Sequence, residues 1–565
     1  MVDFDEEKQN KELDDIHKLE EEQLVKMLAE SKYNLPYVDL SRIGVDNEAL
    51  RAIDEKDSRE MNIAPFKLSG KNLLVAVRAP SEDILNKIKD QIARKNLIPV
   101  FYMASSASLK KVWDRYQELS MAESSKIGGI DISAEILRNT AKNIQKMQDV
   151  EKHVKEALAG NQVHKISRLL EIILAGAIAV QASDVHLEAE ENQARLRLRL
   201  DGVLQDVTFF ELSVYRLLNS RIKLLSGMKL TSKNAQDGRF SIVEANEEIS
   251  IRCSMIPGAY GESIVMRILD PKSIQHKLEE MGIEPYLFSI IEEEIKKPNG
   301  LILLTGPTGS GKTTTLYAFL NKIYSPEIKI ITIEDPIEYH LKGITQTQTN
   351  EEKGYTFLEG LRSALRQDPD VVMVGEIRDS ETAKIAVESA LTGHMVFSTL
   401  HTNNAAGVIP RLIDLDVNAK ILVSALSLSI AQRLVRKLCP ICKKEEIPTE
   451  IQTKTIKMIL EEARTEGKDL KKFGIDFDAP IKLYSPVGCD KCNITGYKGR
   501  IGIFEAIKTD EAIEKIIPEN PSEREIKAIA AKQGILSLRQ DGVIKILTGA
   551  TSYEEVASVV DLNEE

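Results

Sequence analysis

Residues 301–324 read LILLTGPTGSGKTTTLYAFLNKIY, and this stretch is the most informative part of the sequence for the fold. Its centre fits the pattern G-x-x-x-x-G-K-[ST], with a short apolar run before it and a helical pattern after it. Glycines let successive backbone N–H groups turn toward phosphate oxygens, and the N-terminus of the following helix adds its positive end. We expect Lys312 to reach the β- and γ-phosphates and the Thr313 hydroxyl to bind Mg²⁺. The stretch predicts a phosphate-binding loop made of Gly306, Pro307, Thr308, Gly309, Ser310, Gly311, Lys312, Thr313 and Thr314.

Continuous apolar runs recur after this loop, at residues 330–333, 371–374 and 396–400. Strands that are apolar on both faces are typical of a parallel sheet covered by helices. Each run ends at a polar residue, and the carboxyl ends of parallel strands gather at the ligand crevice. The pattern predicts that Glu334 (with Asp335 beside it), Glu376 and His401 join Lys312 as catalytic residues. The alternatives are solvated loop acids and a structural histidine.

Four of the five cysteines form two C-x-x-C pairs, Cys439 with Cys442 and Cys489 with Cys492. Each pair can place two thiolates on one metal ion, and two pairs complete a tetrahedral S₄ site. The spacing therefore predicts structural Zn²⁺, and redox pairing of the thiols is the alternative. The fifth, Cys253, lies alone on an alternating strand and is expected to be a small buried residue.

Composition excludes several classes of protein. The chain has 565 residues, 42% of them hydrophobic, and 75 basic against 87 acidic residues give a net charge of −12. This charge argues against a non-specific nucleic-acid coat. No apolar run reaches the ~20 residues of a spanning helix, since the best candidate, Leu169 to Val180, contains Glu171. The acidic start does not fit a signal peptide, and so few cysteines do not make a disulfide scaffold. We expect a soluble, intracellular protein of several domains.

The N-terminal third predicts smaller units. Residues 3–31 are expected to form a solvated helix or a frayed arm, and residues 72–103 predict a strand, a helix capped by Ser81 and a second strand. A glycine-containing linker follows at about residue 120. Residues 194–210 then alternate apolar and charged side chains on either side of a turn at Asp201-Gly202, which predicts an arginine-bearing sheet in a second α/β domain.

Several long blocks in this order resemble the secretion ATPases of type II secretion and type IV pilus assembly. The similarity runs from about Ala182 to the C-terminus and is looser over the N-terminal domain. It implies that Glu334 belongs to an aspartate-rich box, Glu376 to a Walker B segment and His401 to a histidine box. The blocks that carry it, besides the phosphate loop, are ASDVHLE, RLRLDGVL, QDGRF, GESIVMRIL, ITIEDPIEY, LRSALRQDPDVVMVGEIRDSETA and ALTGHMVFSTLHTN.

The resemblance implies an α/β multidomain fold in which a PAS-like α/β domain precedes a RecA-like P-loop ATPase domain. It also implies a homo-hexameric ring in which arginines of the preceding domain close over ATP. The candidates are Arg199, Arg239, Arg252 and Arg267, and the alternative for each is a solvated or ion-paired strand residue. The tetracysteine module occurs in pilus-extension and type II secretion members and is generally missing from retraction ATPases. The predicted organisation is an N-terminal arm and small α/β docking domain (1–119), a linker with a connecting helix (120–160), a second α/β domain (161–280), the RecA-like domain (281–435), a zinc module (436–505) and a C-terminal helical domain (506–565).

The function implied is a cytoplasmic ATPase motor at the inner face of the cytoplasmic membrane. It would use ATP, Mg²⁺ and Zn²⁺ to power type IV pilus extension or type II secretion. Its partners would be an inner-membrane platform protein and an adaptor, which give peripheral membrane association, with no direct nucleic acid. The alternatives are a DNA-uptake or conjugation ATPase and a nucleotide-gated scaffold that does not hydrolyse ATP. Residues 41–50 only distantly resemble the block that binds cyclic di-GMP in some relatives, so we expect no such site.

Overall fold

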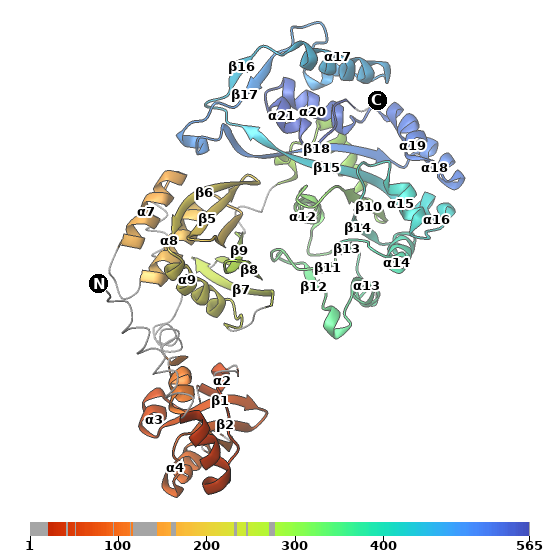
Figure 1. Cartoon of the computed structure of the whole chain (residues 1–565). Coiled ribbons are helices and arrows are strands. Elements are labelled where there is room, and N and C mark those ends of the chain that lie inside the picture. The colour runs from red at the N-terminus through yellow and green to blue at the C-terminus, as the bar shows by residue number, and fades with distance from the viewer. Residues whose placement is uncertain are drawn as a thin grey trace. The chain divides into compact units, whose positions relative to one another are not determined.

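The computed structural model describes residues 21–40, 43, 45–50, 52–93, 95, 97–113, 115–116, 144–159, 165–230, 234–244, 247–270 and 277–563. The chain forms two compact units, Met1–Ser133 with Ser220–Ala235, and Ala134–Asn219 with Gln236–Glu565 (Figure 1). Residues 1–20 of the predicted arm, residues 120–143 of the predicted linker and part of the 41–50 block lie outside the described residues. Within the described residues, no helix has the length and apolar character needed to cross a membrane.

The N-terminal unit is built on a three-stranded sheet. Strands β2 (Asn72–Val77) and β3 (Ile98–Met103) are parallel and are connected through helix α4 (Glu82–Ala93). The Ile84 N–H donates to Ser81 Oγ at 3.4 Å, so the predicted strand, capped helix and strand are confirmed. Strand β1, which the sequence pattern did not single out, pairs antiparallel with β2. Other elements of this unit are β1 (Ile63–Ser69), α2 (Asn47–Leu50), α3 (Glu55–Glu60) and the π-helical turn η1 (Ala29–Tyr33).

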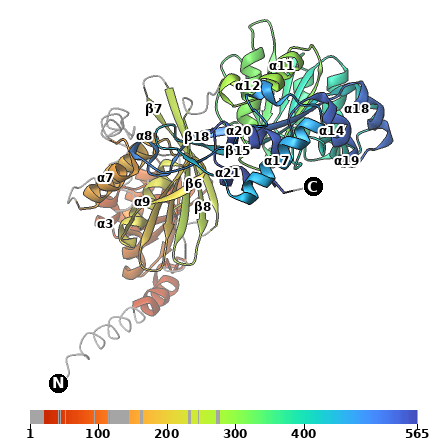
Figure 2. The same cartoon turned by 90° about the horizontal axis from the view of Figure 1, so that it is seen from above.

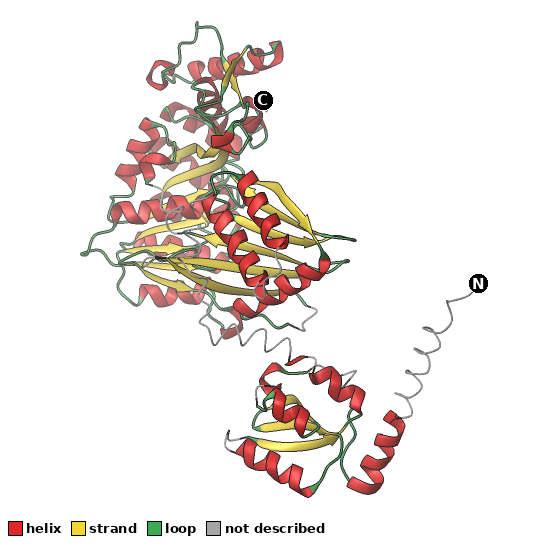
Figure 3. Ribbon diagram, turned by 90° about the vertical axis from the view of Figure 1, so that its left-hand side faces the viewer, coloured by secondary structure: helices red, strands yellow, loops and turns green. Residues whose placement is uncertain are grey.

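The second unit begins with an antiparallel six-stranded sheet in the order β6-β5-β4-β9-β8-β7. Its β5–β6 hairpin turns at Asp201 and Gly202, whose φ angles of 48° and 90° fit the predicted Asp-Gly turn. Helices α7 (Met147–Ala159) and α8 (Lys165–Ala179) lie along one face of this sheet (Figure 3). The other bounds are β4 (Asp184–Ala189), β5 (Ala194–Leu200), β6 (Val203–Phe210), α9 (Leu212–Leu225), β7 (Gln236–Glu244), β8 (Glu247–Pro257) and β9 (Glu262–Leu269).

The second sheet of this unit has seven strands in the order β12-β11-β13-β14-β10-β15-β18. All neighbouring strands are parallel except β15 and β18, which are antiparallel. Every residue of β10, β11, β13 and β14 is buried, as the continuous apolar runs predict. The strands are β10 (Gly300–Thr305), β11 (Ile330–Glu334), β12 (Thr345–Gln348), β13 (Val371–Val374), β14 (Met395–Leu400), β15 (Leu426–Leu438) and β18 (Tyr497–Lys508).

Helices cover both faces of the seven-stranded sheet (Figure 2). Alternate residues of each strand point to opposite faces, so the sheet feeds two separate apolar cores. One core includes helices α11 (Pro285–Glu294) and α12 (Lys312–Ile323). The other includes helices α13 (Phe357–Leu365), α14 (Ser380–Leu391), α15 (Val408–Asp414) and α16 (Ala419–Ala425).

The cysteine-bearing segment is an excursion between two neighbouring strands of this sheet. Strand β15 leaves the sheet at Leu438 and β18 returns to it at Tyr497, so the predicted boundary at residue 435 falls inside β15. The excursion carries β16 (Lys444–Glu446), α17 (Glu450–Thr465) and β17 (Leu483–Ser485). The C-terminal helices are α18 (Glu511–Ile516), α19 (Glu523–Ala530), α20 (Leu538–Leu547) and α21 (Tyr553–Ala557). Short 3₁₀ turns are η2 (Leu278–Glu280), η3 (Glu351–Lys353), η4 (Leu470–Phe473), η5 (Asp490–Cys492), η6 (Ile517–Glu519) and η7 (Ala531–Gln533).

Candidate active site

Three parallel strands end together and bring the predicted residues to one edge of the sheet. In the register, Thr305 at the end of β10 pairs with Leu400 at the end of β14, and Val374 at the end of β13 pairs with Ser398. The glycine-rich loop follows β10, Glu376 follows β13 and His401 follows β14. The structure therefore places the loop, the acid and the histidine at the same edge.

The glycine-rich loop has the backbone that its sequence predicts. Gly306 and Gly311 have φ angles of 143° and 87°. A Cβ atom at Gly306 would meet the Gln432 carbonyl oxygen at 2.5 Å, so no other residue fits there without a shift of the backbone. Helix α12 begins at Lys312, directly after the loop, and the Thr313 side chain is exposed at its first turn. The loop and its hydroxyl are thus open to a phosphate ligand.

Lys312 lies over the start of the loop. Its Nζ donates hydrogen bonds to the carbonyl oxygens of Gly306, at 2.8 Å, and of Pro307, at 3.1 Å. Partial burial lowers the pKa of Lys312, and the nearby carboxylate of Glu376 opposes this effect. The Lys312 cation is therefore close enough to the Glu376 carboxylate for their charges to interact.

Glu376 is held by two neighbours at the end of β13. Its carboxylate forms an ion pair with Arg378, and its Oε2 lies 3.2 Å from His401 Nε2. Partial burial raises the pKa of Glu376, but the hydrogen bonds and charges of Arg378 and His401 outweigh it and bring the pKa below its ordinary value. Glu376 is consequently ionised at neutral pH and can accept a hydrogen bond from a water molecule.

Glu334 has a different environment. Its side chain is only 2% exposed, and it accepts hydrogen bonds from the hydroxyls of Thr332 and Tyr317 and from Gln346 Nε2, the last at 3.0 Å. Burial raises its pKa, although these hydrogen bonds oppose the effect. The structure thus brings Glu376 and His401 together and encloses Glu334 in a separate network beside helix α12. A catalytic role for Glu334 stays a prediction.

A cavity of about 490 Å³ lies beside Glu376, next to the N-termini of α13 and α14. Asp335, Phe357, Arg378 and Asp379 contribute to its lining, whereas no residue of the glycine-rich loop does. Asp335 therefore faces this cavity, although the preceding residue, Glu334, is enclosed. Arg378 lies between the cavity and Glu376 and is the residue that links them.

We expect Arg378→Gln to shift the acid limb of the pH–rate profile to higher pH. Arg378 stabilises the charged form of Glu376, so its loss raises the pKa of that carboxyl. Activity that depends on ionised Glu376 is lost as the pH falls through this pKa. When the pKa is higher, the activity is lost at a higher pH. Rates of ATP hydrolysis measured from pH 4.5 to 8 test this. The control is Arg366→Gln, which changes an exposed arginine and should leave the acid limb unchanged. An unchanged acid limb in Arg378→Gln would contradict it.

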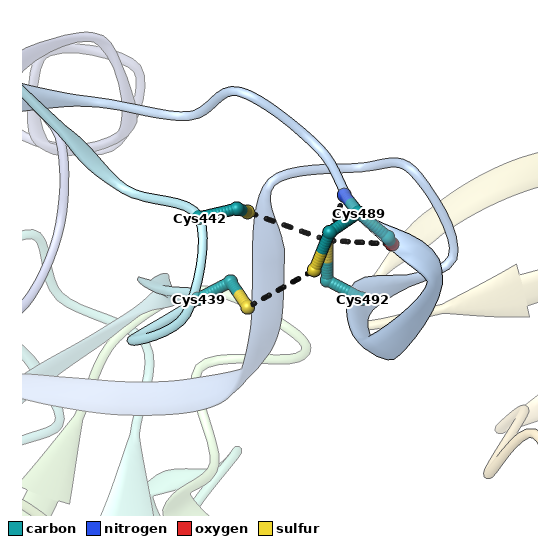
Figure 4. A group of neighbouring side chains, drawn as sticks. All are labelled: Cys439, Cys442, Cys489 and Cys492. Carbon is teal, nitrogen blue, oxygen red and sulfur yellow. Dashed lines mark hydrogen bonds between the residues drawn. The ribbon is translucent and has the colours of Figure 1, made fainter.

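The four paired cysteines form one cluster outside the sheet (Figure 4). All four Sγ atoms lie within 4.8 Å of one another, and Cys439–Cys489 and Cys442–Cys492 are 3.9 and 3.7 Å apart. Four sulfurs bound tetrahedrally at ~2.3 Å from a zinc ion would lie ~3.8 Å apart, whereas a disulfide requires about 2.05 Å. The spacing therefore fits a metal ion rather than a disulfide, and the cluster could hold zinc.

The backbone favours the thiolate form, which binds metal, at one member of the cluster, Cys492. The N–H groups of Cys489 and Gly496 donate to Cys492 Sγ at 3.1 and 3.2 Å. Burial raises the pKa of the Cys492 thiol, but these hydrogen bonds outweigh it and lower the pKa below its ordinary value. The fifth cysteine, Cys253, is 2% exposed within β8, as the alternating pattern predicts.

We expect the wild-type chain to contain one zinc ion and Cys492→Ser to lose it. Substitution of a residue that hydrogen-bonds a metal ligand lowers the metal affinity about 10–100-fold. Substitution of a ligand itself should therefore lower the zinc affinity more than ~100-fold. Metal analysis after dialysis against a weak chelator measures this, and Cys253→Ala serves as the control that keeps its zinc. A wild-type protein without metal, in which all four thiols titrate freely, would refute the site.

The four candidate arginines lie on the six-stranded sheet. Arg199 and Arg267 share Asp184, with N···O distances of 3.2 and 3.0 Å, and Arg252 pairs with Glu338 at 3.0 Å. Arg239 on β7 is exposed, and no ion pair is recorded for it among the described residues. Three of the four arginines are thus already paired with a carboxylate. That these arginines approach a nucleotide stays a prediction.

The sequence pattern did not indicate two residues of this site. They are Arg378, which pairs with Glu376, and Arg433, whose Nη1 lies 3.0 Å from the point where a Cβ atom of Gly306 would lie. Arg378 follows Glu376 by two residues, so the short spacing was a usable signal. Arg433 reaches the loop only because β15 pairs with β10, and no local pattern indicates this contact.

A phosphate loop after a central parallel strand, with an acid at the end of the next strand but one, defines a RecA-like P-loop ATPase. The solved structure of the ATPase DotB from Legionella pneumophila agrees in fold, with a TM-score of 0.50, 21% identity, and coverage of 69% of this chain and 94% of that one. The model of the family "Type II/IV secretion system protein" matches residues 160–558, and that of the MshEN domain matches residues 33–123. The chain belongs to the type II/IV secretion system protein family and is a P-loop enzyme that hydrolyses ATP.

Two relatives illustrate the similarity. Type II secretion system protein E of Aeromonas hydrophila is 44% identical over 395 residues, which are 70% of this chain and 75% of the relative. The type IV pilus assembly ATPase PilB of Pseudomonas aeruginosa is 37% identical over 535 residues, 94% of this chain and 90% of the relative. These similarities show a secretion or pilus ATPase and confirm the resemblance seen in the sequence.

Proposed function

We propose that this chain is an ATPase motor that powers the assembly of a type IV pilus. The observation that carries the proposal is the common sheet edge at which the phosphate loop, Glu376 and His401 meet. Phosphoryl transfer to water requires a cation at the phosphates and a carboxylate that acts on the water. The phosphate loop supplies the cation through Lys312, Glu376 is the carboxylate, and His401 lies beside it.

The proposed chemistry assigns a role to each group. The N–H groups of the loop and Lys312 bind the β- and γ-phosphates, and Lys312 exchanges its present carbonyl partners for phosphate oxygens. Ionised Glu376 accepts a hydrogen bond from the attacking water, and His401 keeps this carboxylate oriented. Thr313 would hold Mg²⁺, which when bound neutralises charge on the phosphates.

Closure over ATP would come from the arginine-bearing sheet in a homo-hexameric ring. Charge spread over the phosphoryl oxygens is stabilised by cations placed around it, which the candidate arginines Arg199, Arg239, Arg252 and Arg267 could supply. Arg239 supports the proposal best because it is exposed, whereas the other three would have to leave their carboxylate partners.

The motor would act through partners at the inner face of the cytoplasmic membrane. We propose an inner-membrane platform protein and its adaptor as those partners, with the N-terminal unit as the docking part and Zn²⁺ in the tetracysteine cluster. The similarity to PilB extends over 94% of the chain, whereas that to type II secretion protein E extends over 70%. This difference favours pilus assembly over type II secretion.

Deletion of the gene in its source organism tests the proposal. We expect surface pili to disappear and to return with the wild-type gene but not with the Glu376→Gln variant. Normal pili together with a loss of secreted proteins would assign the motor to type II secretion. Hydrolysis by the purified protein that is strongly stimulated by DNA would instead indicate a DNA-translocating ATPase.

A further inference from the structure

Strand β15 brings a second cation, Arg433, to the phosphate loop. Thr305 of β10 pairs with Ala431 of β15, so Arg433 lies two residues beyond, level with the start of the loop. Its Nη1 is 3.0 Å from the point where a Cβ atom of Gly306 would lie, and Ser310 Oγ is 2.8 Å from the same point. The guanidinium thus packs against the first glycine of the loop.

Arg433 is held by carbonyl oxygens. Its Nη1 donates to the Gln432 carbonyl at 3.0 Å, and its Nη2 donates to the Asn403 carbonyl at 2.6 Å. Within the described part of the chain, no ion pair is recorded for it, and burial lowers its pKa while the carboxylate of Glu505 opposes this effect. A guanidinium partly removed from water gains less from carbonyls than from a carboxylate.

The Asn403 carbonyl belongs to the loop that carries His401, defined here as the histidine loop, residues 401–407. The Thr402 N–H donates to Thr305 Oγ1 at 2.7 Å, and the Ala405 N–H donates to Glu505 Oε1 at 2.8 Å. Arg433 is a third connection, and it joins the histidine loop to the phosphate loop at Gly306. The histidine loop, which carries His401 beside Glu376, is thus held by contacts that include Arg433.

We propose that Arg433 is a positioning residue for ATP hydrolysis, which holds the histidine loop against the phosphate loop so that His401 and Glu376 face the bound phosphates. The inference rests on the roles proposed above for His401 and Glu376. It assigns Arg433 to turnover rather than to binding, because Nη2 of Arg433 is bonded to the histidine loop at Asn403, whereas Lys312 already lies over the phosphate loop. Displacement of a catalytic group by about 1 Å can cost 10²-fold in rate, so loss of this contact should be measurable.

The test compares Arg433→Gln, His401→Ala and the double variant, with steady-state phosphate release for kcat and a fluorescent ATP analogue for Kd. We expect Arg433→Gln to lower kcat about 10–100-fold and to change Kd less than ~3-fold. The double variant should have a kcat within ~3-fold of the lower single variant, because residues that act through one another are not additive. Arg433→Lys keeps a cationic donor and should recover part of the loss. Lys437→Gln, on an exposed residue of the same strand, should behave as wild type.

Three results would overturn the inference. The first is a wild-type kcat in Arg433→Gln. The second is a Kd of Arg433→Gln raised more than ~10-fold, which would indicate that Arg433 binds the phosphates, and the third is fully additive losses of kcat in the double variant. If Arg433→Gln does not fold, Arg433→Lys takes its place in the test. We expect its kcat to be at least ~3-fold below wild type at unchanged Kd, and a wild-type kcat would overturn the inference. A wild-type kcat in His401→Ala contradicts the proposed role of His401 whatever Arg433 does, so the two failures are distinguishable.

Discussion

The Glu376→Gln variant should bind ATP normally and hydrolyse it at least ~100-fold more slowly than wild type. Glutamine has nearly the same shape and its amide oxygen can still accept from Arg378, so the end of β13 should keep its structure. The variant loses the charge with which we propose that Glu376 acts on water, and a positioned general base contributes about 10²–10⁴-fold. Removal of a negative charge near the phosphates does not weaken ATP binding. Steady-state phosphate release and the Kd of a fluorescent ATP analogue measure both quantities.

The control for this variant is Glu388→Gln, which changes an exposed glutamate on α14 without touching the sheet edge. We expect its hydrolysis rate to stay within ~2-fold of wild type. A Glu376→Gln variant that turns over at a similar rate would remove Glu376 from the catalytic residues.

The Lys312→Ala variant should lose both affinity and turnover. Lys312 lies over the loop, and a charge-assisted hydrogen bond contributes about 1.5–3 kcal/mol, which predicts a Kd raised ~10–150-fold. Turnover at saturating ATP should fall further, because the same cation stabilises the charge on the transferring phosphoryl group. Isothermal titration with ATP and phosphate release at several ATP concentrations separate the two effects.

Lys342→Ala removes an exposed lysine elsewhere in the same unit and should leave both quantities unchanged. If Lys312→Ala binds and hydrolyses ATP as wild type does, the nucleotide does not occupy the glycine-rich loop in the way proposed here.

The parts of the site that depend on local chain geometry could be predicted from the sequence. The glycines of residues 306–311 determine the loop, and the buried strands before Glu376 and His401 place both at the carboxyl edge of a parallel sheet. The cysteine cluster was predictable for the same reason, since two short C-x-x-C turns present paired sulfurs.

The parts that depend on long-range pairing could not be predicted. Arg433 meets Gly306 because β15 extends beyond β10, and β18 joins the sheet only after the cysteine-bearing excursion. Glu334 is a second residue whose surroundings depend on long-range packing. Its position at the end of a strand predicted a carboxylate accessible to a ligand. The hydroxyl of Tyr317, on the helix after the loop, and the amide of Gln346 instead enclose it. A sequence pattern gives the strand end, but packing of a neighbouring helix decides whether the side chain is open.

We propose that Lys312 and Glu376 face the same bound triphosphate. A structure of the Glu376→Gln variant with ATP and Mg²⁺ would show whether they do. We predict that Lys312 Nζ contacts the γ-phosphate and that one ordered water bridges this phosphate and the side chain of residue 376. A nucleotide bound with residue 376 on the far side of the sheet, and no water between them, would contradict the account.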